Sequence, residues 1–138
     1  MAGSAARYFF LFLIGLVAGV IGTVMAMRAL DARKDHFPES LMYVQQWHLN
    51  QLHANVEQNK CGAIDTIPHL QALRTSANSL EQAFPDLSDD ERFVKHASGL
   101  RAALDTSLAT PPLNCPGLGA AAKDVGEACK ACHQDFRN

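Results

Sequence analysis

The sequence predicts an all-α protein: an up-down-up-down four-helix bundle preceded by one N-terminal transmembrane helix. Three observations lead to this prediction. Residues 8–27 contain no charged side chain. The rest of the chain shows four stretches in which apolar side chains recur every three or four positions, and it shows no alternating strand pattern. Proline and glycine residues fall between these stretches, where helices end.

Residues 8–27 are long enough to cross a membrane. About 20 residues with a rise of about 1.5 Å each span about 30 Å, the thickness of the hydrocarbon core. The apolar core of a secretory signal peptide is shorter, at about 7–15 residues, and the residues at the end of this run make a poor cleavage site. We therefore expect residues 1–30 to hold an uncleaved anchor, with a cleaved signal peptide as the alternative.

Two glycines in the apolar run indicate a possible partner for the anchor. Gly15 and Gly19 are four residues apart and therefore lie on one helix face, and Thr23 continues this small face. Such a face is typical of contacts between transmembrane helices, although glycine is common in membrane helices in general. A charged linker that ends in Pro38 follows at residues 31–38.

Residues 39–138 are predicted to form the bundle, with helices at 39–59, 66–84, 89–108 and 118–136. The apolar stripes of these four helices are, in order, Met42, Leu49, Leu52 and Val56; Ile67, Leu70, Leu73, Ala77, Leu80 and Phe84; Phe93, Ala97, Leu100, Leu104 and Leu108; and Leu118, Ala122, Val125, Cys129, Cys132 and Phe136. Short connections make each helix antiparallel to the next.

Local signals mark two of the helix starts. Asp65 or Thr66 is the expected N-cap of the second helix. At the third helix, Ser88 and Glu91 have the spacing of a capping box, in which the hydroxyl and the carboxylate accept hydrogen bonds from free backbone N–H groups. His48 and His53 lie off the stripe of the first helix and are expected on the surface.

Composition excludes one class of function. The net charge is −2, and the part of the chain after the anchor is mildly acidic. A basic patch of the kind that nucleic acid requires is missing from the sequence. We therefore expect no nucleic-acid partner.

Residues 129–133 read Cys-Lys-Ala-Cys-His, the attachment signature of c-type haem. Cys129 and Cys132 share a helix face, so both thiols can reach the vinyl groups of one porphyrin, and His133 can turn its imidazole to the iron. A thioredoxin-like Cys-x-x-Cys motif opens a helix after a strand, whereas this one closes the last helix. A structural zinc site needs two further ligands at matching spacing, and Cys61 and Cys115 do not have that spacing. We therefore expect one covalently attached haem c.

The other two cysteines, Cys61 and Cys115, are expected to form a disulfide. An exported domain meets oxidising surroundings. In an up-down bundle the connection that contains Cys61 and the connection that contains Cys115 lie at the same end. Two unpaired thiols are the alternative.

Residues 124–137, Asp-Val-Gly-Glu-Ala-Cys-Lys-Ala-Cys-His-Gln-Asp-Phe-Arg, resemble the last helix of the cytochromes c prime and, more broadly, of the class II c-type cytochromes. The resemblance covers about residues 36–138 and is specific at this helix. It implies a four-helix bundle with His133 as the proximal haem ligand. It also implies that Arg137 is the basic residue near the proximal face, and a solvated cation at a helix C-terminus is the alternative for that residue.

The resemblance also implies a distal residue on the first helix, which falls at Met42. Members with Leu there are usually five-coordinate gas binders, and members with Met are usually six-coordinate electron carriers. Met42 is therefore the expected second axial ligand of the haem iron, with an open site or a histidine ligand as the alternatives. The sequence departs from the family at Pro38, where many members have Arg, and in its anchor, since most members are soluble.

The function expected from these features is that of a membrane-anchored monohaem c-type cytochrome. It carries electrons in a periplasmic respiratory or photosynthetic chain, either alone or within a larger complex, and its partners are redox proteins. The alternative is a five-coordinate binder of nitric oxide or carbon monoxide. An enzyme is not expected, because we find no nucleophile–base pair and no open metal site apart from the haem.

Haem c attachment sets the expected location: a single-pass protein of the bacterial inner membrane, with the haem domain in the periplasm and the haem at the membrane-proximal end of the bundle. Three cations that follow the span, Arg28, Arg33 and Lys34, argue weakly for the opposite topology.

Overall fold

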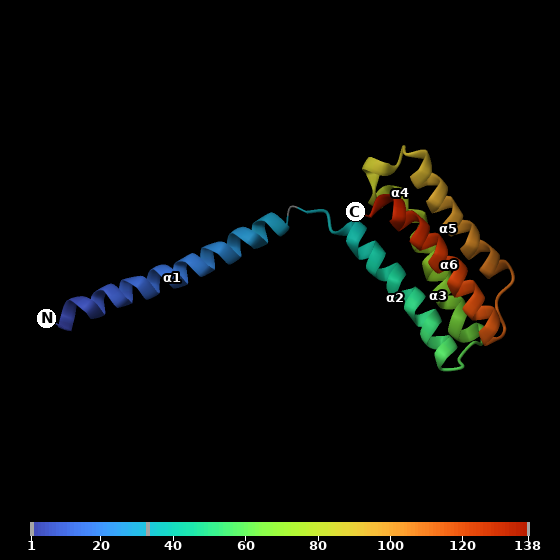
Figure 1. The fold of residues 1–138 in the computed structure, drawn as a ribbon, viewed down its shortest axis with the longest axis horizontal. Helices are drawn as coiled ribbons and strands as arrows, with labels where there is room; N and C mark the ends of the chain where they lie inside the picture. The colour runs from blue at the N-terminus through green and yellow to red at the C-terminus, as the bar shows by residue number, and fades with distance from the viewer. Residues whose placement is uncertain (1, 33, 138) are drawn as a thin grey trace. The chain divides into compact units, whose positions relative to one another are not determined.

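The computed structural model describes residues 2–32 and 34–137, and within these ranges the chain is helical and contains no strand. It divides into two compact units, Met1–His36 and Phe37–Asn138. Figure 1 follows the chain through both units by colour. The prediction of an all-α protein with an N-terminal apolar helix is therefore confirmed.

The first unit is the helix α1 (Ala2–Asp31). Its segment Arg7–Asp31 has 25 residues with a hydropathy of 2.5, which makes it long and apolar enough to span a membrane. All of the large apolar side chains from Tyr8 to Leu30 are exposed within the chain. A helix that is apolar on every side is typical of a membrane span rather than of a surface helix.

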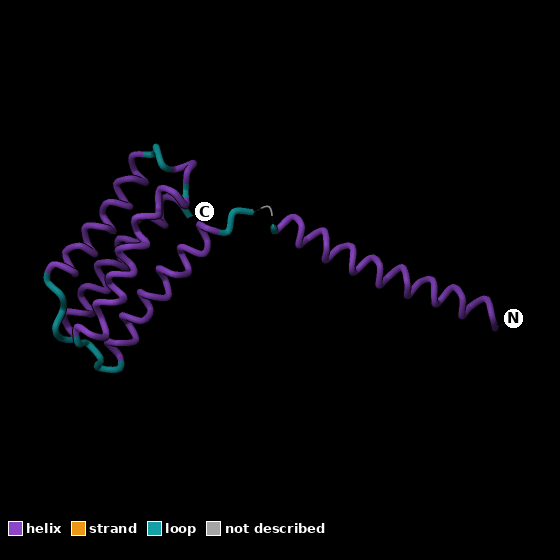
Figure 2. The backbone as a smooth tube through the Cα atoms, turned by 180° about the vertical axis from the view of Figure 1, so that it is seen from behind, coloured by secondary structure: helices purple, strands orange, loops and turns teal. Residues whose placement is uncertain are grey.

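The second unit contains four long helices: α2 (Phe37–Glu57), α3 (Ala63–Ser76), α5 (Glu91–Ala109) and α6 (Cys115–Phe136). Three short elements join α3 to α5: the 3-10 turn η1 (Ala77–Ser79), the single helical turn α4 (Leu80–Ala83) and the 3-10 turn η2 (Pro85–Leu87). Helix α2 packs against α3 and α6, and α5 packs against the same two helices. Figure 2 shows these helices side by side.

Leucine side chains hold the four helices together. Leu52, Leu70, Leu104 and Leu118 come from α2, α3, α5 and α6, and each has no exposed surface. Burying a leucine side chain stabilises a fold by about 1.5–3 kcal/mol. All four lie on the stripes that the sequence predicts, so the periodicity identified the core correctly.

The start of α2 differs from the prediction. Helix α1 continues to Asp31 and α2 begins at Phe37, so the expected linker, 31–38, is too long at both ends. Pro38 lies in the first helical turn rather than before it. Proline is tolerated there because the first N–H groups of a helix have no partner within the helix.

The second predicted helix, 66–84, is wrong as one continuous element. Helix α3 begins at Ala63 with Gly62 as its N-cap, and Thr66 is buried inside the helix, where its hydroxyl donates to the Gly62 carbonyl oxygen (3.1 Å). The helix ends at Ser76, whose hydroxyl donates to the Leu73 carbonyl oxygen (2.9 Å). Such side-chain bonds to the backbone compete with the helical pattern.

The capping box predicted at the third helix is also wrong. The N-cap of α5 is Asp90, whose carboxylate accepts a hydrogen bond from the Arg92 N–H (2.8 Å). Ser88 is instead the C-cap residue of η2 and donates its hydroxyl to the Pro85 carbonyl oxygen (2.7 Å). An aspartate at the N-cap satisfies a free N–H and also places a negative charge at the positive end of the helix.

Cys61 and Cys115 form the predicted disulfide, with their sulfur atoms 2.05 Å apart. Cys61 lies in the connection from α2 to α3, and Cys115 is the first residue of α6. Figure 1 shows both regions at the same end of the second unit. Helix α6 begins three residues before the predicted 118, because Asn114 caps it by accepting a hydrogen bond from the Gly117 N–H (2.8 Å).

Candidate functional site

The Cys-x-x-Cys-His motif lies in the last two turns of α6. The buried residues Leu118, Ala122 and Val125 fix the face of α6 that packs on the other helices. Cys129 and Cys132 continue the same spacing of three and four residues, and both pack against the hydrophobic core. The motif therefore faces the interior of the second unit.

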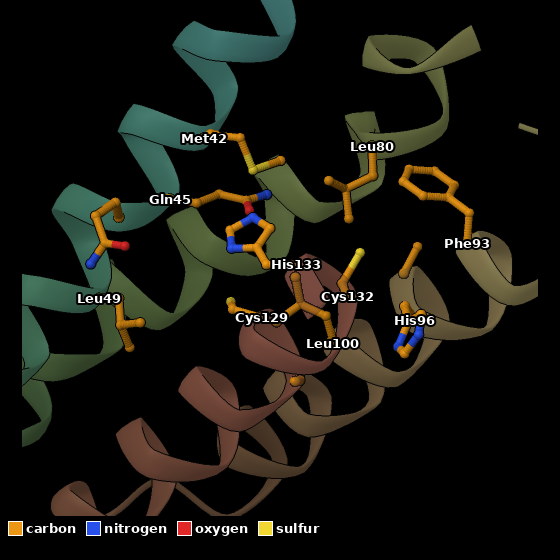
Figure 3. Close-up of a pocket in the computed structure, with 13 residues that line it drawn as sticks. Met42, Gln45, Leu49, Leu80, Phe93, His96, Leu100, Cys129, Cys132 and His133 are labelled. Atoms are coloured by element: carbon orange, nitrogen blue, oxygen red, sulfur yellow. The ribbon is translucent and has the colours of Figure 1, made fainter. Parts of the chain in front are cut away.

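A mostly apolar cavity of about 50 Å³ lies beside the motif. Figure 3 shows Met42 and Gln45 pointing from α2 toward the imidazole of His133. The cavity is lined by Met42, Gln45, Gln46 and Leu49 from α2, Leu80 from α4, Phe93, His96, Ala97 and Leu100 from α5, and Ala128, Cys129, Cys132 and His133 from α6. The structure thus brings Met42, near the start of the second unit, together with Cys129, Cys132 and His133, near its end, and all four were predicted from the sequence.

An open hollow of about 490 Å³ adjoins this cavity and shares Cys129 and His133 with it. Arg137 lines the hollow and is exposed, and its backbone N–H donates to the His133 carbonyl oxygen (3.0 Å). Arg137 therefore lies on the same side of α6 as His133, while remaining accessible to solvent.

Gln45 is one of four lining residues that the sequence analysis did not identify, with Gln46, His96 and Ala128. It is 6% exposed, and within the described part of the chain its side-chain Nε2 is buried without a hydrogen-bond partner. Leaving a buried donor unsatisfied costs about 1–3 kcal/mol. Position 45 completes the stripe from Met42 to Leu49, so helical spacing could have identified it if glutamine had been accepted as a buried residue.

The two thiols of the motif are held in the neutral form. Burial, and then the neighbouring Cys132, raise the pKa of Cys129; burial, and then Asp135, raise the pKa of Cys132. Their position near the negative end of the helix dipole also disfavours a thiolate. Disulfide oxidoreductases need a thiol with a lowered pKa, so this pair does not suit that chemistry.

Two polar contacts tie the walls of the cavity together. His96 on α5 approaches Asp135 on α6 with 2.8 Å between Nε2 and Oδ2. Arg101 on α5 donates to Glu81 on α4 at 2.7 and 3.1 Å, and this bond lowers the pKa of Glu81. Phe93 adds an edge-to-face contact with Phe136, at 5.6 Å between ring centroids.

The two histidines of α2 differ in their exposure to solvent. His53 is exposed, as predicted. The prediction of a surface position is wrong for His48, which is half-buried and lies 2.9 Å from His69 of α3 between Nδ1 atoms. The burial of His48 could not be read from the apolar stripe, because His48 lies outside that stripe, on the side of α2 that faces α3.

Comparison with known proteins finds no matching family model, no matching curated protein and no matching solved structure. Within residues 2–32 and 34–137, no group of three or more His, Cys, Asp or Glu side chains has the arrangement of a metal site. The site is thus defined by its own residues: two thiols, two imidazoles, one thioether and two side-chain amides line a mostly apolar cavity.

Proposed function

We propose that the chain is a membrane-anchored monohaem c-type cytochrome that transfers electrons, and that its second unit is an up-down-up-down four-helix bundle. One observation carries the proposal: Cys129, Cys132 and His133 occupy the inward face of α6 beside a mostly apolar cavity. Haem c needs two thiols on one helix face, an adjacent imidazole and an apolar environment.

The chemistry of the donors fits this cofactor. Neutral, half-buried thiols suit a pair that is consumed by covalent attachment. The unpartnered Nε2 of Gln45 is a donor inside an apolar cavity, and an acceptor on a bound group would satisfy it. A buried donor without a partner costs free energy, so a polar atom of a bound group is a suitable partner for Nε2 of Gln45.

The size of the cavity adds a condition. About 50 Å³ is well below the roughly 300–1,000 Å³ of small-molecule sites, so the lining side chains must move apart. Met42 has a flexible thioether chain with three rotatable bonds, so it can change rotamer to make room. The adjoining hollow beside Cys129 and His133 supplies further space.

When bound, haem c supplies one-electron chemistry between Fe(II) and Fe(III). Cys129 and Cys132 would hold the cofactor covalently through their thiols, and His133 and Met42 would bind its iron. A thioether ligand and apolar walls such as Leu100 both favour a relatively high reduction potential.

The alternative function is a five-coordinate haem that binds nitric oxide or carbon monoxide. Met42 distinguishes the two, because it lines the cavity opposite α6 and is well placed to close the sixth position. Absorption spectra of the oxidised and reduced protein, with and without carbon monoxide, test this. A low-spin spectrum that carbon monoxide leaves unchanged supports electron transfer; a high-spin spectrum and ready carbon monoxide binding refute it in favour of gas binding.

We propose the bacterial inner membrane as the location, with α1 as a single span and the second unit in the periplasm. Met42 lies close in sequence to the anchor, so a haem beside it suits exchange with a membrane-bound redox partner. Gly15 and Gly19 have open space where a side chain would lie, which leaves that face available to a neighbouring helix. Protease added to sealed spheroplasts should digest the haem domain; protection from digestion would contradict this topology.

A further inference from the structure

Two histidines outside the cavity face each other across neighbouring helices. The Nδ1 atoms of His48 on α2 and His69 on α3 are 2.9 Å apart, and the ring centroids are 5.2 Å apart. Both side chains are half-buried. In the neutral pair, one Nδ1–H donates to the lone pair of the other Nδ1.

The packing around the pair holds the two rings in place. His48 precedes the buried Leu49, and His69 precedes the buried Leu70, so each backbone is fixed by the core. Trp47 lies against both rings, with centroid distances of 4.8 Å to His48 and 5.6 Å to His69. Trp47 itself is 54% exposed, which keeps the pair open to solvent on one side.

The protonation state leaves nitrogen lone pairs available. Burial, and then the proximity of His69, lower the pKa of His48, so this imidazole stays neutral at neutral pH. A neutral imidazole is the form that binds transition metals. Metal binding needs both neutral rings in the tautomer that carries the proton on Nε2, so the Nδ1 proton of the hydrogen-bonded pair moves to Nε2 of the same ring through solvent. A modest rotation about the broad χ2 torsion then directs both Nδ1 lone pairs to one point.

The distance between the nitrogens favours one class of metal. With metal–nitrogen bonds of about 2.0–2.1 Å, two ligands at a right angle are about 2.9 Å apart, and two ligands at a tetrahedral angle are about 3.4 Å apart. The observed 2.9 Å matches the right angle. Square-planar or tetragonal sites with nitrogen ligands suit Cu(II) or Ni(II), and Cu(II) binds most tightly in the divalent series.

We propose that His48 and His69 bind one Cu(II) ion through their Nδ1 atoms, with water in the remaining positions. No third side chain completes the site within the described residues, so the ion is exchangeable rather than structural. The proposal is independent of the haem, because neither histidine lines the haem cavity.

The test uses the full-length, haem-loaded protein in detergent, titrated with Cu(II) alone. Electron paramagnetic resonance should show one tetragonal Cu(II) with nitrogen ligands, and calorimetry should give one site that prefers Cu(II) to Zn(II). His48→Ala and His69→Ala should each weaken binding at least as much as the roughly 10–100-fold loss caused by changes outside the ligand shell. His53→Ala, at the exposed histidine of the same helix, is the matched control and should bind as the unmutated protein does.

His69→Asn keeps a hydrogen-bonding group next to His48 without supplying an imidazole, and thus separates metal binding from helix packing. It should fold normally and lose the Cu(II) signal. Unchanged Cu(II) binding in the His48 and His69 variants overturns the proposal, as does an unmutated protein that shows no nitrogen-ligated Cu(II). In either case the two histidines serve only as a hydrogen-bonded contact. The haem spectrum is read in the same samples, so failure of the haem proposal is seen separately.

Discussion

The Cys61–Cys115 disulfide ties the connection between α2 and α3 to the first turn of α6, and its removal should strongly destabilise the second unit. The two cysteines are separated by 54 positions. Closing a loop of this length lowers the entropy of the unfolded chain by an amount worth ~4 kcal/mol at 25 °C. The double variant Cys61→Ala/Cys115→Ala should therefore lose about this much stability, which is a large share of the roughly 5–15 kcal/mol typical of a domain.

Urea denaturation followed by far-ultraviolet circular dichroism measures the loss. With a urea dependence of about 1–3 kcal/mol per molar, the midpoint should fall by ~1–4 M. Reducing the unmutated protein with dithiothreitol is the control, because it opens the loop without changing a side chain. Both treatments should shift the midpoint by similar amounts.

A loss below about 1 kcal/mol in both experiments would refute this reasoning, since it would mean that the unfolded chain gains little freedom when the loop opens. A large loss in the double variant with a small one on reduction would have another meaning. It would assign the effect to the buried Cys61 side chain, which is 5% exposed, rather than to loop closure.

Three further predictions concern the cavity, the core and pH. Met42→Leu should open the sixth position of the haem, which absorption spectra would report as a high-spin form that binds carbon monoxide; an unchanged low-spin spectrum would exclude Met42 as the ligand. Leu104→Ala removes a side chain with no exposed surface and should lower the free energy of unfolding by about 2–5 kcal/mol, measured by urea denaturation. A loss below about 1 kcal/mol would mean that neighbouring side chains fill the space left by Leu104 and would contradict this prediction. Arg101 lowers the pKa of Glu81 in the folded state, so this pair stabilises the protein above the ordinary glutamate pKa, and the contribution is lost as pH falls through the lowered value. Glu81→Gln should therefore remove about 1–2 kcal/mol at pH 7 and flatten the acid limb of stability against pH, and an unaltered limb in the variant would contradict the assignment.

The core could be predicted from the sequence because leucine recurs with helical spacing in every long helix. Leu52 and Leu104 have no polar group to satisfy, so burial on the common face is the one favourable arrangement for them. The Cys-x-x-Cys-His motif was placed correctly for the same reason: its cysteines continue the stripe of Val125. Periodicity therefore located both the core and the inward face of the candidate site.

Helix ends were harder to predict, because several side chains compete for the same backbone groups. In the sequence, Ser88 and Asp90 are both suitable caps for α5. In the structure the Ser88 hydroxyl is bonded to the Pro85 carbonyl oxygen, and the Asp90 carboxylate accepts the Arg92 N–H instead. The sequence indicates Thr66 as an N-cap, but in the structure Thr66 lies inside α3 and its hydroxyl donates to the carbonyl oxygen of Gly62, the N-cap. These outcomes depend on how neighbouring segments meet, which a linear pattern does not contain.

Two polar residues of functional interest could not be identified from residue type. Glutamine usually lies at the surface, and histidine is intermediate between surface and interior, so residue type alone does not predict burial of Gln45 or His48. Their burial comes from partners on other helices: α6 and its motif for Gln45, and His69 of α3 for His48. The burial of Gln45 and His48 can therefore be identified only from the packing of the helices against one another.

The most direct test of the central claim is the intact mass of the full-length protein, produced in cells that attach haem to periplasmic proteins and measured after acid denaturation. We expect the mass of the chain plus one haem, with Cys129 and Cys132 both unavailable to an alkylating reagent. Loss of attachment in Cys129→Ala/Cys132→Ala is the matched control. An unmutated chain that has the bare polypeptide mass and takes up two alkyl groups at Cys129 and Cys132 would contradict the claim.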